Sequence, residues 1–223
     1  MKPLLVLAAF PVVLMGWASC SHSGTGHAAL PDPRAVDKSV PEYKNPFHPS
    51  TYAHFVARKD YRKTYDVYKD DTLLNRQPKK SRKIFVCLDE QRGQYLVDGL
   101  VAMDFPLSSG VKAYPTKTGD YAVISKKEDH ASNLYGKMYD AEGKCINYNA
   151  ESTDPIPEGG RFDGSPMPYW QRLTNAGLGL HVGKVRRHPV SHGCVRLPRN
   201  VAEILYRQTS IGTPVTIQKT PLP

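Results

Sequence analysis

A short stretch near the C-terminal end combines a thiol, two imidazoles and a guanidinium at close spacing. The residues concerned are His181, His192, Gly193, Cys194 and Arg196. Only the thiolate of a cysteine is a strong nucleophile, and a neighbouring base or positive charge promotes its formation. Gly193 permits a tight turn before the sulfur, which would leave backbone N–H groups free to bind an oxyanion. Two interpretations follow from these residues: nucleophilic catalysis by Cys194, and a small buried cysteine beside polar loop residues, which a cysteine and a histidine alone would favour.

The sequence around this cysteine resembles a known enzyme family. Residues 191–197 read Ser-His-Gly-Cys-Val-Arg-Leu, and Gly-Leu-His lies upstream at residues 179–181. This arrangement closely resembles the signature of the L,D-transpeptidases (YkuD-type catalytic domain), cysteine enzymes that remodel peptidoglycan. The resemblance covers about residues 83 to 218 and includes Gln91 and the Pro-x-Ser-x-Gly region at residues 106–110. Lys117 stands where the family usually has proline.

The resemblance implies an acyl transfer in two steps. Cys194 would attack the amide carbonyl between the third and fourth residues of a peptidoglycan stem peptide, giving a thioester and releasing D-Ala. An amine from a second stem, or water, would then resolve the thioester. His181 is the implied base, with its second nitrogen oriented by a backbone carbonyl. His192 is the weaker candidate, because a side chain on the same tight loop is poorly placed to reach the sulfur. Activation of this kind predicts a depressed pKa for the Cys194 thiol.

The other residues of the stretch are expected to bind the oxyanion or the substrate. His192 would shape this region, and Gly193 and Cys194 would supply backbone N–H donors. Ser191 would position the loop or touch the substrate. Arg196 would either hold a substrate carboxylate through paired hydrogen bonds or form a structural salt bridge.

Two aromatic residues, Tyr169 and Trp170, precede the strand that is expected to carry His181. Large aromatic side chains often pack in a core, but this position also suits the wall of a cleft. The loop at residues 184–190 is shorter than the corresponding segment of many family members. Its length suggests altered recognition of the acceptor.

The N-terminal segment resembles a bacterial lipoprotein signal. Residues 4–17 are mostly apolar, and small residues precede Cys20. The apolar run is too short for a comfortable transmembrane helix. Lipidation of Cys20 after cleavage would anchor the protein to a membrane of the cell envelope, facing the periplasm. Because Trp17 stands where leucine is usual, a plain secretory signal and a free periplasmic protein are the alternative.

Composition narrows the partners and cofactors. The chain has 223 residues, 4 cysteines and a formal net charge of +9. Its lysines and arginines are scattered and no nucleic-acid motif occurs, so cell-wall carboxylates or anionic lipids are the expected partners. No cysteine or histidine spacing typical of a metal site is present, and we expect neither a metal nor another cofactor. A disulfide between Cys87 and Cys145 is possible in an oxidising compartment, although Cys87 also suits a core strand. The oligomeric state stays open.

The expected fold is mainly β: a YkuD-like mixed β-sandwich with a short helix near its C-terminal end. The expected parts are a signal peptide at residues 1–20, a tether with a short helical and basic extension at 21–82, and the catalytic domain at 83–218. Asp98-Gly99 between two apolar runs predicts a hairpin with a type I′ turn. Asn200 to Glu203 reads as a capping box at the start of the helix.

Two further segments carry weaker signals. A partial helical stripe of aromatic residues at 51–74 predicts a helix, which either packs on the domain or binds a partner or the cell wall. Residues 132–166 predict a long irregular loop of the kind that is functional, disordered or a lid.

These features together predict a cysteine acyltransferase, an L,D-transpeptidase that acts on tetrapeptide stems. The alternatives are an L,D-carboxypeptidase, another cysteine peptidase or amidase acting on peptidoglycan, and a non-enzymatic wall-binding lipoprotein. The presence of Cys194 together with His181 argues against the last, because a binding module has no need of a nucleophile beside a base.

Overall fold

The structure is a computed structural model that describes residues 31–76 and 81–221. The expected signal segment and Cys20 lie outside the described residues, as does the centre of the basic segment at 77–80. The chain divides into two units, residues 1–31 and 32–223, and the second contains every helix and strand described below. In the described ranges, no helix is long and apolar enough to cross a membrane.

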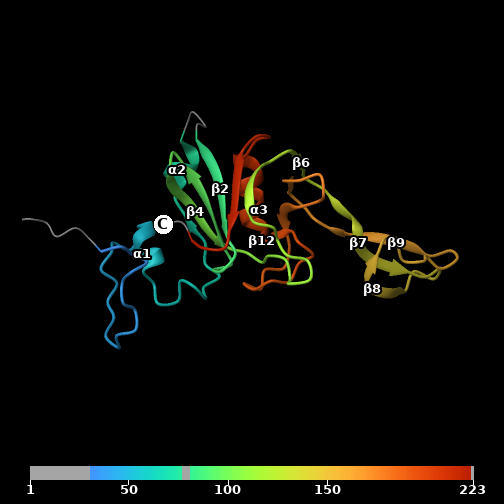
Figure 1. The fold of residues 1–223 in the computed structure, drawn as a ribbon, viewed down its shortest axis with the longest axis horizontal. Coiled ribbons are helices and arrows are strands. Elements are labelled where there is room, and N and C mark those ends of the chain that lie inside the picture. The colour runs from blue at the N-terminus through green and yellow to red at the C-terminus, as the bar shows by residue number, and fades with distance from the viewer. Residues whose placement is uncertain (1–30, 77–80, 222–223) are drawn as a thin grey trace, which may run out of the picture. The chain divides into compact units, whose positions relative to one another are not determined.

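A six-stranded sheet, in the order β1-β4-β3-β2-β13-β5, forms one layer of the second unit (Figure 1). Its strands are β1 (Tyr68–Lys69), β2 (Arg82–Cys87), β3 (Arg92–Val97), β4 (Leu100–Pro106), β5 (Gly119–Ala122) and β13 (Pro214–Gln218). The C-terminal strand β13 inserts between β2 and β5 and runs parallel to β2. The predicted turn between β3 and β4 is confirmed, since Asp98 and Gly99 have φ angles of 50° and 79°, as a type I′ turn requires.

A four-stranded sheet, in the order β12-β11-β10-β6, forms the second layer. It contains β6 (Ser125–Lys127), β10 (Trp170–Arg172), β11 (Gly179–Val182) and β12 (Val195–Leu197). β11 is antiparallel to β10 and parallel to β12, and α3 (Arg199–Gln208) follows β12. Buried apolar side chains from both sheets and from α3, such as Phe105, Leu180 and Leu205, form one continuous core. The predicted mixed β-sandwich with a short helix near the C-terminal end is therefore confirmed.

The predicted capping box at the start of α3 is wrong. The N-cap is Pro198, and no side chain makes a capping hydrogen bond there. Asn200 therefore already lies in the first turn, where it cannot act as the cap. Glu203 instead forms an ion pair with Arg207 at 2.5 Å, one helical turn later.

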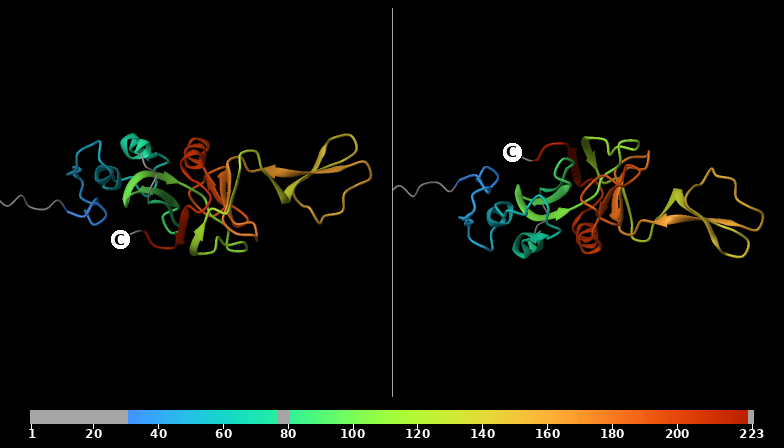
Figure 2. Two further views of the ribbon diagram at one scale, coloured as in Figure 1. Left: turned by 90° about the horizontal axis from the view of Figure 1, so that it is seen from above. Right: turned by 90° about the horizontal axis from the view of Figure 1, so that it is seen from below.

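A separate three-stranded antiparallel sheet occupies most of the segment that was predicted to be an irregular loop. It has the order β8-β7-β9 and consists of β7 (Ala131–Tyr139), β8 (Cys145–Glu151) and β9 (Arg161–Pro166). The prediction of irregular structure is therefore wrong. The strands could not be recognised in the sequence because they are largely exposed and lack a regular apolar alternation. Figure 2 shows the sheet extending to one side of the sandwich, joined to it through the neighbourhood of β6 and β10.

The two cysteines considered for a disulfide are both free thiols. Cys145 lies in β8, whereas Cys87 is buried at the end of β2. The Cys87 thiol donates to the carbonyl oxygen of Lys219 at 3.1 Å. Cys87 is thus a core residue, as the simpler interpretation held.

The segment before the sandwich packs on the six-stranded sheet. α1 (Tyr52–Val56) and α2 (Asp71–Asn75) are each 5 residues long, so the prediction of a helix through residues 51–74 is wrong. Packing of the aromatic residues on the domain is confirmed, because the Tyr52 and Tyr61 hydroxyls donate to the Asp104 carboxylate at 2.7 and 2.8 Å.

Residues 32–49 also contact their surroundings and do not behave as the expected tether. The Arg34 guanidinium pairs with the Glu90 carboxylate at 3.1 Å. Lys38 donates to the Val56 carbonyl at 2.6 Å. Polar contacts to residues far along the chain hold a segment whose low apolar content had suggested a flexible linker.

Candidate active site

A cavity of about 420 Å³ opens between the four-stranded sheet and the β7–β9 sheet. Its lining includes most of the residues that the sequence predicted for the site: Trp170, His181, Ser191, His192, Cys194 and Arg196. Gly193 and Tyr169 are not among its lining residues. The fold thus brings together side chains from β10, β11 and β12 with the turn before β12.

The parallel pairing of β11 with β12 places His181 and Arg196 on one face of the sheet. In this register His181 pairs with Arg196, and Leu180 pairs with Val195. Side chains alternate between the two faces along a strand, and paired residues share a face. Cys194 lies in the turn directly before β12, and Cys194, His181 and Arg196 all line the cavity.

β11 holds His181 in a single tautomer. Its Nδ1 lies 2.7 Å from the carbonyl oxygen of Val182. A carbonyl can only accept, so Nδ1 carries the proton and Nε2 keeps a lone pair. Burial lowers the pKa of His181 to about 4, helped by Arg196 and His130 and opposed by the bond to Val182. The ring is therefore neutral at neutral pH and Nε2 is available as a base.

The Cys194 thiol is also neutral at rest. It donates to the Gly177 carbonyl at 3.3 Å. Burial raises its pKa, and a backbone hydrogen bond at Gly179 and the charge of Arg196 only partly oppose this effect. The expectation of a depressed pKa is wrong, because desolvation of the sulfur outweighs the one nearby positive charge. The pair consists of a neutral thiol and a neutral imidazole, and the thiol needs a base in order to react.

The turn that carries Cys194 is held by its own Ser191. The Ser191 hydroxyl donates to the Cys194 carbonyl at 2.5 Å and accepts from the Gly193 N–H at 3.2 Å. Gly193 has a φ of 110°, which a residue with a Cβ rarely adopts. Its N–H is therefore used inside the turn, contrary to the expectation that it would be free for an oxyanion. The Cys194 N–H makes no hydrogen bond within the described residues.

The segment between β4 and β5 (residues 107–118, here called the strap) packs directly against this turn. The Thr116 hydroxyl accepts from the Gly110 N–H at 2.8 Å and donates to the Gly193 carbonyl at 2.7 Å. A Cβ on Gly110 would lie 2.0 Å from the Tyr114 carbonyl oxygen and 2.9 Å from the Gly193 Cα. The Pro-x-Ser-x-Gly region thus has a structural reason for its glycine, which is close approach of two backbones. Sequence reasoning did not identify Thr116, whose partners lie in other segments.

His192 joins the turn to the β7–β9 sheet. Its ring stacks on Tyr135 of β7 with centroids 4.4 Å apart, and Tyr114 lies 4.7 Å away on the strap. His192 therefore lines the cavity as part of an aromatic cluster. Tyr114, Tyr135 and His192 lie far apart in the sequence, so their contact could not be predicted from spacing.

Trp170 and Tyr169 have different surroundings. The Trp170 ring lies 5.9 Å from the ring of His181 in the cavity. A Cβ on Gly179 would lie 2.5 Å from this indole, so the glycine makes room for it. Tyr169 packs on the core and on Tyr206, with centroids 5.6 Å apart. Tyr169 was expected as a possible cleft wall, but it packs on the core and does not line the cavity.

The cavity has an excess of positive charge. Arg172, Lys184 and Arg196 line it, opposite the single carboxylate of Glu151. Arg196 makes no ion pair with any described residue, so the alternative of a structural salt bridge is wrong. Such a lining suits a ligand with carboxylate groups. In the described part of the chain, no three His, Cys, Asp or Glu side chains gather as a metal site would require.

The sequence matches a family of known proteins and one of its relatives. Residues 81–217 match the family described as the L,D-transpeptidase catalytic domain, YkuD. The chain is 31% identical over 121 residues to "Probable L,D-transpeptidase 3" of Mycobacterium tuberculosis, and the match covers 51% of this chain and 38% of the relative. The match thus spans less than half the length of that curated relative.

Solved structures of the same description are also similar. An L,D-transpeptidase from Mycobacterium smegmatis shares 22% identity at a TM-score of 0.47, over 61% of this chain and 58% of that one. The catalytic domain of the E. faecium L,D-transpeptidase shares 27% identity at a TM-score of 0.45, over 64% of this chain and 100% of that one.

Proposed function

Because the chain belongs to the L,D-transpeptidase catalytic-domain (YkuD) family, we propose that it is a peptidoglycan L,D-transpeptidase with Cys194 as the nucleophile and His181 as the base. The family acts on peptidoglycan stem peptides. One observation carries the assignment of residues: His181, fixed with its proton on Nδ1, lines the same cavity as Cys194. A buried structural cysteine has no need of such a neighbour.

In the first step, Nε2 of His181 takes the thiol proton while Sγ of Cys194 attacks the amide carbonyl before the terminal D-Ala of a tetrapeptide stem. A carbon–sulfur bond forms and the carbonyl oxygen becomes an oxyanion. When the intermediate collapses, the carbon–nitrogen bond breaks and the imidazolium returns its proton to the departing amine. The Cys194 N–H is the available oxyanion donor. The Gly193 N–H can act as a second donor once its hydrogen bond to the Ser191 hydroxyl is broken.

In the second step, an amine of another stem attacks the thioester. His181 removes a proton from the attacking nitrogen, the carbon–sulfur bond breaks, and the Cys194 thiol is restored. Water in place of the amine gives carboxypeptidation by the same steps. Every proton in this scheme moves between His181, Cys194 and the substrate, so the scheme needs no cofactor.

The charge of the cavity supports a stem peptide as the ligand. Arg172, Lys184 and Arg196 offer positions for the carboxylates of such a peptide. The stack of His192 on Tyr135 places aromatic surface at the same cavity. An extended peptide can pass between the two sheets here and present one amide to Cys194.

The test is incubation of the full chain with a tetrapeptide muropeptide, read by mass spectrometry, with Cys194→Ala alongside. Dimers formed with loss of D-Ala are the expected product, and the variant should form none. Tripeptide monomers alone would replace transpeptidation by carboxypeptidation. No product of either kind from the folded wild-type chain would contradict the proposal.

We also propose a lipid anchor on Cys20, which holds the catalytic region at the periplasmic face of a membrane. The support is the apolar run and the small residues before Cys20 in the sequence. Radiolabelled fatty acid should be incorporated into the wild-type chain and not into Cys20→Ala. Absence of label from the wild-type chain as well as from Cys20→Ala would remove the lipid anchor and leave the secreted periplasmic form.

A further inference from the structure

The loop at residues 184–190 joins the His181 strand to the Cys194 turn. It makes hydrogen bonds to Thr64 and Tyr65, which precede the residues 81–217 that match the family. We propose that Arg187 is a positioning residue for the proposed reaction, and that residues 52–66 brace the loop through it. The inference rests on the proposed function. It gives a role to a segment that precedes the matched residues 81–217.

The loop is tied near both ends, and its centre has an unfavourable backbone conformation. The Arg186 N–H donates to the Ser108 hydroxyl at 2.8 Å, and the Val190 N–H donates to the Ser109 carbonyl at 2.8 Å. Between these ties, Arg187 has a φ of 57°. A residue with a Cβ rarely adopts this left-handed conformation unless surrounding contacts hold it there.

The side chain of Arg187 provides those contacts. Its Nη1 donates to the Thr64 carbonyl at 2.6 Å, and its Nη2 donates to the Glu90 carbonyl at 2.9 Å. No carboxylate of the described residues pairs with this guanidinium. The neighbouring Tyr65 hydroxyl donates to the Arg186 carbonyl at 3.3 Å. Two bonds in a planar fork fix orientation as well as distance.

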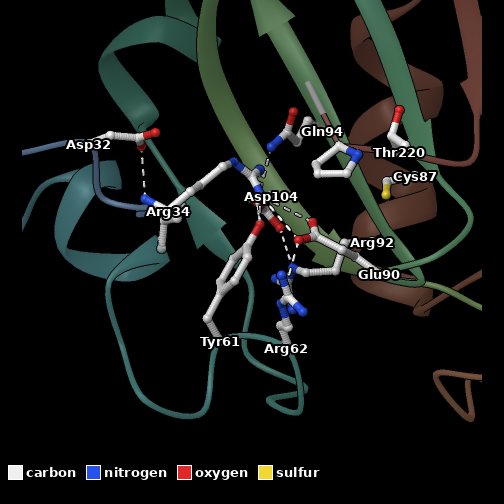
Figure 3. A network of polar contacts seen from close by, with 12 residues as sticks. Asp32, Arg34, Tyr61, Arg62, Cys87, Glu90, Arg92, Gln94, Asp104 and Thr220 are labelled. Atoms are coloured by element: carbon white, nitrogen blue, oxygen red, sulfur yellow. Dashed lines mark hydrogen bonds and ion pairs between the residues drawn. The ribbon is translucent and has the colours of Figure 1, made fainter. Parts of the chain in front are cut away.

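The Thr64 carbonyl is itself held by a buried network. It also accepts from Arg92 Nη1 at 3.2 Å. The Arg92 and Asp104 side chains are 1% and 0% exposed and form an ion pair at 2.5 Å. Figure 3 shows Tyr61 and Arg92 converging on Asp104. The carbonyl that holds Arg187 therefore belongs to the junction between the N-terminal segment and strands β3 and β4.

The Glu90 carbonyl, which is the second acceptor for Arg187, also belongs to a residue with several contacts. Arg34 pairs with the Glu90 carboxylate. The next residue, Gln91, donates to the Ser109 hydroxyl at 2.8 Å and accepts from the Ser109 N–H at 2.9 Å. The Ser109 carbonyl in turn accepts from the Ser191 N–H at 3.0 Å, at the start of the Cys194 turn.

The consequence is a loop whose shape depends on Arg187. When the two side-chain bonds are lost, the left-handed centre can relax, and the turn that presents Cys194 to His181 shifts with it. Small misplacements of reacting groups cost large factors in rate. Arg187 does not line the cavity, whereas Lys184 does, so we expect substrate binding to change much less than the chemical step.

The test compares Arg187→Ala, Arg187→Lys and Arg186→Ala in the full chain. Arg186 is exposed and its replacement makes the same change of charge, so it is the matched control. The measurements are kcat and KM with a tetrapeptide muropeptide, the alkylation rate of Cys194 against pH, and the thermal unfolding midpoint.

Arg187→Ala should lower kcat by about tenfold or more, with KM changed by less than about threefold, and should alter the alkylation profile of Cys194. Arg187→Lys should recover part of kcat, because an ammonium can reach one of the two carbonyls. Arg186→Ala should match the wild type. A folded Arg187→Ala with wild-type kcat and alkylation profile would overturn the proposal, as would an equal loss in Arg186→Ala.

Two further results keep the test decisive. If Arg187→Ala does not fold, Tyr65→Phe removes only one hydroxyl bond to the loop, and a kcat equal to that of the wild type would then count against the brace. If the wild type forms no muropeptide product, the proposed function fails. The brace can still be judged in that case, because the alkylation profile of Cys194 needs no substrate.

Discussion

Burial moves the pKa values of Cys194 and His181 in opposite directions, and both shifts favour the neutral form. The thiol pKa is raised and the imidazole pKa is lowered, in each case chiefly by desolvation. A thiolate–imidazolium pair at rest would require the reverse of both shifts. The geometry therefore favours proton transfer during attack, with His181 as a general base.

Alkylation of Cys194 tests this neutral pair. We expect the pH midpoint for iodoacetamide modification to lie above that of a cysteine in an unstructured peptide, because only the thiolate reacts. Mass spectrometry of the peptide that contains Cys194 separates its reaction from that of Cys87 and Cys145. A midpoint below neutrality would instead indicate a resting ion pair and contradict the general-base scheme.

The lowered pKa of His181 also has a consequence for stability. In the unfolded chain the imidazole binds a proton near its usual pKa, whereas in the folded protein it does so only at about 4. The unfolded state thus binds more protons between these values, and stability falls as pH decreases through this window. The shift corresponds to about 3 kcal/mol when the window has been crossed.

The matched variant is His181→Asn, whose amide can still donate to the Val182 carbonyl but does not titrate. Urea unfolding at pH 7 and at pH 4.5 should show a larger loss of stability for the wild type than for this variant. All other titrating groups are common to both proteins. Equal losses would mean that His181 is not held neutral by burial.

At the scale of elements, the strap after β4 and the turn before β12 act as one piece through Thr116. Its buried hydroxyl bridges the Gly110 N–H and the Gly193 carbonyl. Thr116→Val keeps the shape and leaves both groups without a partner, which should lower the free energy of unfolding by about 1–3 kcal/mol. The rate of muropeptide turnover should fall as well, because the turn is then free to move.

Thr118→Val is the control for this prediction, since it makes the same change at an exposed position on the same strap. It should leave both stability and turnover close to those of the wild type. Chemical denaturation and product formation measure the two effects. If Thr116→Val behaved like Thr118→Val, the strap would have no part in positioning the turn.

An element could be predicted from the sequence where the interactions that form it lie between residues close together in the chain. The turn at Asp98-Gly99 was predictable because both residues of a type I′ turn are local. The β7–β9 sheet was missed because its strands are largely exposed and lack the regular apolar alternation that marks a strand. Contacts such as that between Tyr135 and His192 join distant segments and leave no trace in spacing.

The contacts of the N-terminal segment could not be predicted for the same reason, because they also join distant parts of the chain. The low apolar content of residues 32–49 suggested a tether, yet Arg34 and Lys38 in this segment make polar contacts to Glu90 and Val56. Arg92 and Asp104 are charged residues in strands, and sequence alone does not show that charged side chains will be buried as a pair. The partners that satisfy them, Tyr52 and Tyr61, come from outside the sandwich.

At the scale of the whole molecule, the Arg92–Asp104 pair couples the stability of the sandwich to the segment that precedes it. Asp104 accepts hydrogen bonds from Tyr52 and Tyr61 as well as from Arg92. Asp104→Asn leaves a buried guanidinium without its counter-charge, and removal of one partner of such a pair typically costs about 3–5 kcal/mol. We expect a loss of this size in urea unfolding.

The exposed pair of Arg161 and Asp163 provides the comparison. Its side chains are 56% and 50% exposed, so Asp163→Asn should cost less than about 1 kcal/mol. Limited proteolysis gives a second readout, because loss of the buried charge should loosen the N-terminal segment and expose it to cleavage before the sandwich unfolds. If Asp104→Asn unfolded at the wild-type urea concentration with that segment still protected, the pair would not be the link between the two. The bracing of Arg187 through Thr64 would then have to depend on the apolar packing of Phe55 and Val56.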